Sequence, residues 1–169
     1  MMYESGDMAT TAVSHKFSKE KYQRIAVLPF DVSTGGTDSV VADKLSLKLM
    51  EEGFSVIERA QLGKVFAELK LNMTGALAPE ELKKLGKTLS VDLIVFGTIN
   101  MVNVPAQATA YQAMDAYSYV GTETVRFVDV ETGEVMINSF CCDKDIGSNS
   151  RINEIAASIH RHMQPSGPQ

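Results

Sequence analysis

The chain has 169 residues, of which 44% are hydrophobic and 22% charged. These are the values of an ordinary folded domain, and they exclude collagen-like, coiled-coil and disordered chains. The formal net charge of -5 and the lack of any long basic run argue against nucleic-acid binding, because neutralising phosphates requires clustered cations. The longest apolar stretch, residues 91–101, is far shorter than the roughly 20 residues of a membrane-spanning helix.

The two ends of the chain differ in character from its middle. Residues 1–22 are polar and show no periodic apolar pattern, so they are expected to form a flexible leader. Residues 23–163 are expected to form a single α/β domain. Residues 164–169 contain two prolines and a glycine and are expected to fray.

The first half of the domain alternates strand and helix patterns, which predicts a βαβα unit with parallel strands. Thr37 and Asp38 provide an N-cap for the first helix, and Gly53 provides its stop. Pro79 opens the third helix with acidic residues after it. The expected strands are residues 24–30, 54–58 and 91–100, and the expected helices are residues 38–53, 60–71 and 79–89.

The second half of the domain changes topology. Two strand patterns, residues 121–130 and 135–143, flank the segment Glu131–Glu134, which has glycine at its third position and predicts an antiparallel hairpin. A closing helix is expected over residues 151–163. The predicted fold is therefore α/β, with a mixed sheet of about five strands flanked by helices.

Residues that could support chemistry are sparse. Gly35 and Gly36 precede a helix, but they match no phosphate-binding motif. His160 and His162 are two apart on a helix and do not share a face. No metal-ligand spacing occurs, and the adjacent Cys141 and Cys142 offer no disulfide framework. We therefore predict no catalytic residues, no cofactor and no metal.

A charged pair after a strand and a set of three tyrosines are two further candidate groups. Glu58 and Arg59 follow a buried strand directly and are expected to fix the turn into the next helix. Tyr111, Tyr117 and Tyr119 have the same parity in the segment 101–119, so they would line one side of it if extended. Exposed tyrosines favour contacts with a protein partner, although packing against the sheet is an equal alternative.

Four short sequence segments, with the order and spacing found in the family, resemble the CsgG-type curli assembly and transport lipoprotein family over about residues 24–140. They are RIAVLPF at 24–30, VIERAQL at 56–62, LGKTLSVDLIVFGTI at 85–99 and VRFVDVETGEV at 125–135. Five residues within these segments are expected to be structural motif residues of the family: Glu58, Arg59, Gly97, Thr132 and Gly133.

The resemblance implies an exported bacterial lipoprotein that faces the periplasm and is anchored to the outer membrane through an N-terminal cysteine. Related folds include lipoprotein activators of penicillin-binding proteins and ring-forming lipoproteins of exopolysaccharide export. The sequence has no cysteine near its start, so the anchor would lie outside it. The secretion channel of the family needs two membrane-crossing hairpins per subunit, for which residues 101–119 and 143–151 are too short.

The resulting hypothesis is a non-enzymatic envelope domain that acts in protein–protein assembly or export. Its partner would be a copy of itself or another envelope protein, and it would contact the membrane only through the lipid anchor. A cytosolic nucleotide- or small-ligand-binding domain is the first alternative, because open α/β sheets often bind ligands at strand ends. A subunit of a secretion pore is the second.

Overall fold

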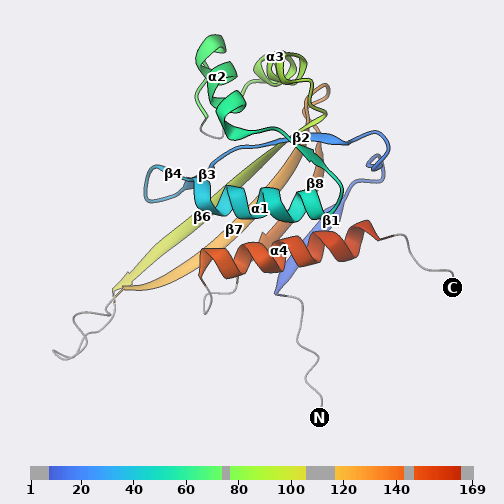
Figure 1. The fold of residues 1–169 in the computed structure, drawn as a ribbon. Coiled ribbons are helices and arrows are strands. Elements are labelled where there is room, and N and C mark those ends of the chain that lie inside the picture. The colour runs from blue at the N-terminus through green and yellow to red at the C-terminus, as the bar shows by residue number, and fades with distance from the viewer. Residues whose placement is uncertain (1–7, 74–76, 106–116, 143–146, 165–169) are drawn as a thin grey trace, which may run out of the picture.

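The computed structural model describes residues 8–73, 77–105, 117–142 and 147–164. Within them, an eight-stranded mixed sheet carries two helices on each side (Figure 1). The strands are β1 (Ala9–Val13), β2 (Arg24–Val27), β3 (Phe30–Val32), β4 (Thr37–Asp38), β5 (Ser55–Val56), β6 (Leu93–Pro105), β7 (Tyr117–Asp129) and β8 (Val135–Cys141). The helices are α1 (Ser39–Glu51), α2 (Arg59–Leu69), α3 (Pro79–Leu89) and α4 (Ser148–Met163).

The sheet has a parallel half and an antiparallel half, as predicted from the sequence. Its main order is β1-β8-β7-β6-β2-β5, with β3 pairing β4 and β6. Strand β2 runs parallel to both β5 and β6, whereas β6, β7, β8 and β1 pair antiparallel in succession. The mixed α/β fold is confirmed, and the strands absent from the prediction are β1 and the short β3–β4 pair.

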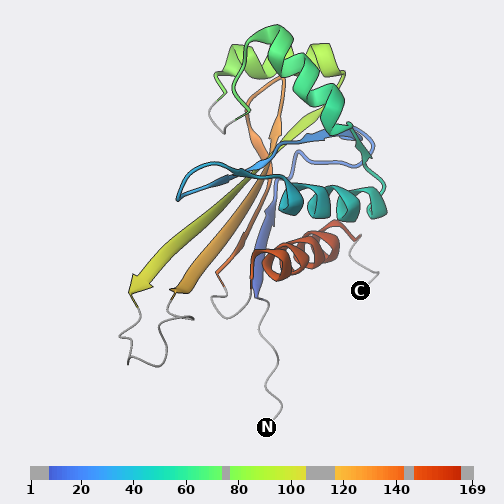
Figure 2. The same cartoon turned by 60° about the vertical axis from the view of Figure 1, so that its left-hand side comes forward.

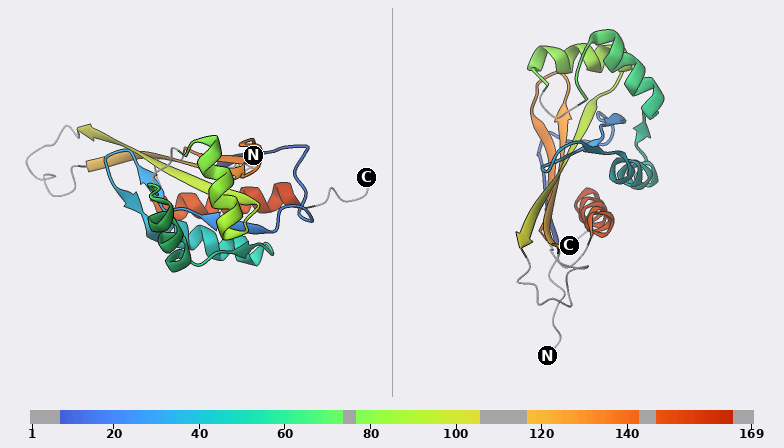
Figure 3. Two further views of the ribbon diagram at one scale, coloured as in Figure 1. Left: turned by 90° about the horizontal axis from the view of Figure 1, so that it is seen from above. Right: turned by 90° about the vertical axis from the view of Figure 1, so that its left-hand side faces the viewer.

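Two apolar cores lie on opposite sides of the sheet. Helices α1 and α4 cover one side, where Leu45, Phe127 and Ile155 are fully buried. Helices α2 and α3 cover part of the other side, where Leu62 and Leu85 pack among strand residues. Figure 3 shows α1 and α4 side by side along one side of the sheet, with α2 and α3 at one end.

The helix ends follow the sequence signals. The carboxylate of Asp38 accepts a hydrogen bond from the Val41 N–H at 3.0 Å, as an N-cap does. Pro79 is the first residue of α3, and the Glu81 carboxylate accepts a bond from the Ala78 N–H at 2.8 Å. Gly35 and Gly36 form the turn between β3 and β4, so they do not lie directly before a helix as the sequence suggested.

The expected leader is partly wrong, because residues 9–13 form strand β1 at an edge of the sheet. The segment gave no strand signal because the adjacent Thr10 and Thr11 interrupt any alternation of apolar and polar residues. Thr11 is nevertheless buried, and its hydroxyl is hydrogen-bonded to Ser139 at 2.8 Å and to Ser158 at 2.7 Å. A buried hydroxyl is tolerated when it is bonded in this way. The proposed tail lies outside the described residues beyond Gln164.

Candidate functional site

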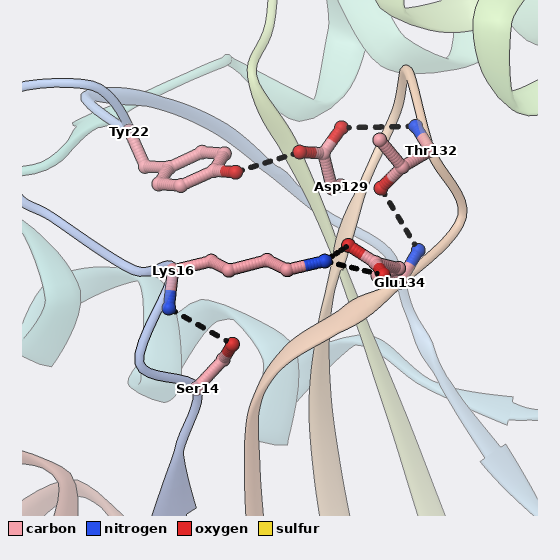
Figure 4. Close-up of polar contacts among 6 residues, drawn as sticks. All are labelled: Ser14, Lys16, Tyr22, Asp129, Thr132 and Glu134. Carbon is pink, nitrogen blue, oxygen red and sulfur yellow. Dashed lines mark hydrogen bonds and ion pairs between the residues drawn. The ribbon is translucent and has the colours of Figure 1, made fainter.

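A segment that we call the strap, residues 14–22, connects β1 to β2 and is fixed to the turn between β7 and β8 (Figure 4). The Tyr22 hydroxyl donates to Asp129 Oδ2 at 2.7 Å. Asp129 Oδ1 accepts from the backbone N–H groups of Glu131, at 2.7 Å, and Thr132, at 3.2 Å. Tyr22 and Asp129 are 3% and 4% exposed, so this polar contact lies inside the protein.

The environment of Asp129 keeps its carboxyl group ionised. Burial alone would raise the pKa of Asp129, but the hydrogen bonds from Tyr22 and from two backbone N–H groups outweigh it, and the pKa lies below the ordinary 3.8. Burial first, and the bond to Asp129 second, raise the pKa of the Tyr22 hydroxyl. The pair is therefore a neutral donor bonded to a carboxylate, which is among the stronger hydrogen bonds in proteins.

Exposed contacts hold the rest of the strap. Lys16 Nζ donates to Glu134 at 2.8 and 3.0 Å, and this bond raises the pKa of Lys16. Phe17 stacks on the Tyr22 ring with centroids 5.6 Å apart. Lys19 donates to the backbone carbonyl of Glu52 at the end of α1. The strap is thus tied both to the β7–β8 turn and to α1.

Thr132 and Gly133, singled out from the sequence, build the turn that receives the strap. The Thr132 hydroxyl accepts from the Glu134 N–H at 3.2 Å. Gly133 has a φ of 74°, in the region that favours glycine, and its N–H donates to the Asp129 carbonyl at 2.8 Å. The turn motif was visible in the sequence, but nothing there indicated that Tyr22 would contact it.

The other motif residues act in packing between elements. Arg59 Nη2 donates to the Ser39 carbonyl at 2.9 Å and pairs with the Asp43 carboxylate, so it connects the start of α2 to α1. Glu58 is the N-cap residue of α2 and makes no side-chain cap bond. Gly97 faces the ring of Phe30, where a Cβ atom would collide with three ring carbons.

Strands β6 and β7 continue past their neighbours. Ala9 in β1, Cys141 in β8, Glu123 in β7 and Ile99 in β6 form one row across the sheet, where β1 begins and β8 ends. The β6–β7 pairing continues beyond this row to Pro105 and Tyr117. Figure 2 shows the two strands projecting from this end of the sheet, which is also the end where β1 begins. We call them the projecting strands.

The predicted tyrosines belong to this region. Tyr117 and Tyr119 lie in β7, opposite Pro105 and Asn103, and Tyr111 falls outside the described residues. The sequence prediction placed these strands' ends at Asn100 and Gly121, so both strands are longer than expected.

A buried ion pair lies at the base of the projecting strands. Arg151 Nε of α4 is 3.8 Å from Glu123 Oε1 of β7, and the two side chains are 4% and 0% exposed. The guanidinium group also lies against Gly121, where a Cβ atom would collide with it. This contact connects α4 to the strand that projects.

No cluster of three or more His, Cys, Asp or Glu residues in the described part of the chain could hold a metal ion. Among the helices that the structure describes, none is both long and apolar enough to cross a membrane.

Comparison with known proteins gives one family and a group of similar structures. The PelC dodecamer of Paraburkholderia phytofirmans is 12% identical, with 94% of this chain and 98% of that chain covered, at a TM-score of 0.53. A PDZ domain protein of Parabacteroides distasonis is 11% identical, with 94% and 36% covered, at a TM-score of 0.51. The LpoB C-terminal domain of Salmonella enterica is 14% identical, with 70% and 79% covered, at 0.49.

At such identities these likenesses show the fold alone. No curated protein sequence matches the chain. The model of the family described as curli production assembly/transport component CsgG, however, matches residues 5–156, which is most of the sequence. The chain therefore belongs to the CsgG family.

Proposed function

We propose that this protein is a non-enzymatic domain of the bacterial cell envelope that acts in protein–protein assembly or export at the outer membrane. The observation that carries the proposal is the family match over residues 5–156. The proposed location is the periplasm, with an N-terminal lipid anchor to the outer membrane as the only membrane contact.

Self-association is the proposed mode of assembly. PelC, which shares the fold at a TM-score of 0.53, was solved as a dodecamer. Subunits that repeat one heterologous contact close into rings when the rotation between neighbours permits it.

The proposed anchor and the projecting strands would lie at one end of the molecule. Strand β1 begins at Ala9, in the same row of the sheet from which β6 and β7 continue. A lipid attached before β1 would therefore direct the projecting strands, with Tyr117 and Tyr119, toward the membrane side. A partner that the tyrosines contact would be met at that side.

The alternative of a nucleotide-binding domain has less support. Gly35 and Gly36 belong to the β3–β4 turn, and Asp38 caps α1 with its carboxylate, which would repel a phosphate at that helix end.

The location can be tested with the protein expressed from its complete gene in a bacterial host. We expect outer-membrane fractionation, a lipid-modified cysteine in the N-terminal peptide by mass spectrometry, and protease sensitivity only after the outer membrane is opened. A protein found in the cytosolic fraction with an unmodified N-terminus would contradict the proposal and favour the ligand-binding alternative.

A further inference from the structure

The projecting strands leave the sheet as a ribbon of two strands. Strand β8 ends opposite Glu123 of β7, and β3 ends opposite Ile99 of β6. Beyond these residues the β6–β7 pairing continues to Pro105 and Tyr117, and within the described part of the chain no third strand joins it. Two strands by themselves are at best marginally stable in water. Contacts at the base of the ribbon therefore decide how firmly it is held.

The side chain of Arg151 crosses from α4 to this base. Arg151 lies near the start of α4, and its Nε is 3.8 Å from Glu123 Oε1, with both side chains buried. In Figure 1 the projecting strands extend past this end of α4. The guanidinium group also lies over Gly121, where a Cβ atom would collide with Nη1, Nη2 and Cζ. Arg151 therefore contacts β7 at two positions, one in the last row of the wider sheet and one in the ribbon.

These two contacts lie along the strand on one side of it. Glu123 and Gly121 are two residues apart, so they face the same side of β7 at positions about 7 Å apart. The guanidinium group is planar and rigid, so a strand held against it at both positions can neither tilt nor slide without breaking one contact. A contact at one position alone would fix the strand at a single point.

The charges are a costly way to fill this space. Both ions must be taken out of water, and a buried pair is often no more stabilising than apolar side chains of similar volume. The next inward-facing residues of α4, Ile152 and Ile155, are fully buried and apolar. What an ion pair adds over an apolar contact is geometric specificity, because the two charges stabilise each other only when they are placed side by side.

We propose that Arg151 is a clamp that holds the base of the projecting strands against α4 in one orientation, through Glu123 and the space over Gly121. The inference deepens the proposed function, in which these strands meet a partner, and rests on it only for the purpose of the clamp. A ribbon already held in one orientation loses less conformational entropy on binding than a ribbon that swings. The clamp thus prepares the strands for a partner.

The test compares three variants of the full chain. Glu123→Leu together with Arg151→Met replaces the pair by apolar side chains of similar size, so the domain should stay folded without the clamp. Gly121→Ala keeps both charges but fills the space that the guanidinium group occupies. Ile159→Val is the matched control, because it removes a buried methyl group from the same helix, two turns beyond Arg151. Circular dichroism and thermal melting verify that each variant folds.

Hydrogen–deuterium exchange of individual amides is the readout. In the double variant and in Gly121→Ala we expect exchange about tenfold faster in residues 101–105 and 117–121, with wild-type rates in residues 94–98 and 124–128. The Ile159→Val control should show no selective increase in the projecting strands. Wild-type exchange of these strands in either variant would overturn the clamp. Slower exchange in Gly121→Ala would also overturn it, because that is the effect of replacing glycine by alanine inside a strand when nothing else changes.

Native mass spectrometry of the same samples keeps the clamp separate from the proposed function. It reports the number of copies in each sample, whereas the exchange pattern reports how firmly the ribbon is held. A wild type that is monomeric at every concentration would contradict self-association, and the exchange pattern would still decide for or against the clamp.

Discussion

Removal of the Tyr22 hydroxyl tests the account of the strap most sharply. Tyr22→Phe keeps the ring, and with it the stacking on Phe17, but removes the 2.7 Å donor to Asp129. A hydrogen bond to a charged group contributes about 1.5–3 kcal/mol. Two backbone N–H groups still bind the carboxylate, so we expect a loss near the middle of that range, about 2 kcal/mol.

The assay is unfolding by urea and by heat at neutral pH. For a domain of this size, about 2 kcal/mol corresponds to a melting temperature lower by about 4–8 °C. Glu134→Gln is the matched control, because it breaks the neighbouring Lys16 pair, whose side chains are 67% and 48% exposed. Such exposed pairs contribute little to stability, because solvent screens both charges. Equal losses for Tyr22→Phe and Glu134→Gln would refute the reasoning.

The same carboxylate predicts a pH dependence. The pKa of Asp129 is lower in the folded protein than its ordinary value of 3.8, so its stabilising contribution is complete above that value and is lost as the pH falls through the folded pKa. The Asp129→Asn variant should lack this part of the acid-induced loss of stability. A variant whose stability falls with the wild-type slope below pH 3.8 would show that another group is responsible.

Three further substitutions test contacts inside the fold. Gly97→Ala should cost about 1–3 kcal/mol in urea unfolding, because the new methyl group meets the Phe30 ring; a neutral result would contradict that close packing. Glu123→Gln alone should cost about 3–5 kcal/mol, whereas the double variant with Arg151→Met should recover most of the loss, and a double-mutant cycle without coupling would count against the buried pair. Asp38→Ala should cost about 1 kcal/mol by thermal melting through loss of the α1 cap, and an unchanged melting temperature would argue against the cap.

The helices and the central strands could be predicted because local signals determine them. Asp38, Pro79 and the apolar spacing of α1 and α3 act within a few residues of sequence. Strand β1 could not be predicted in this way. Its buried Thr11 is stable only because Ser139 and Ser158, far along the chain, supply hydrogen bonds. A polar segment with distant partners has no local pattern that separates it from a leader.

Only part of the candidate site could be predicted from the sequence. The turn at Thr132 and Gly133 followed from its residue types, but the contact of Tyr22 with Asp129 joins positions 107 residues apart. The side of β7 and β8 opposite α4 could not be predicted for a different reason. The alternation of buried and exposed residues in β7 and β8 can be read from the sequence, but the absence of a covering helix among the described residues depends on which side α4 packs.

The most direct test of the central claim is the absolute mass of the wild-type protein in solution, measured by native mass spectrometry and light scattering over a wide range of concentrations. Self-association through repeated heterologous contacts predicts one closed species of many copies that persists on dilution. A single-copy mass at every concentration would contradict the claim that the domain assembles with itself.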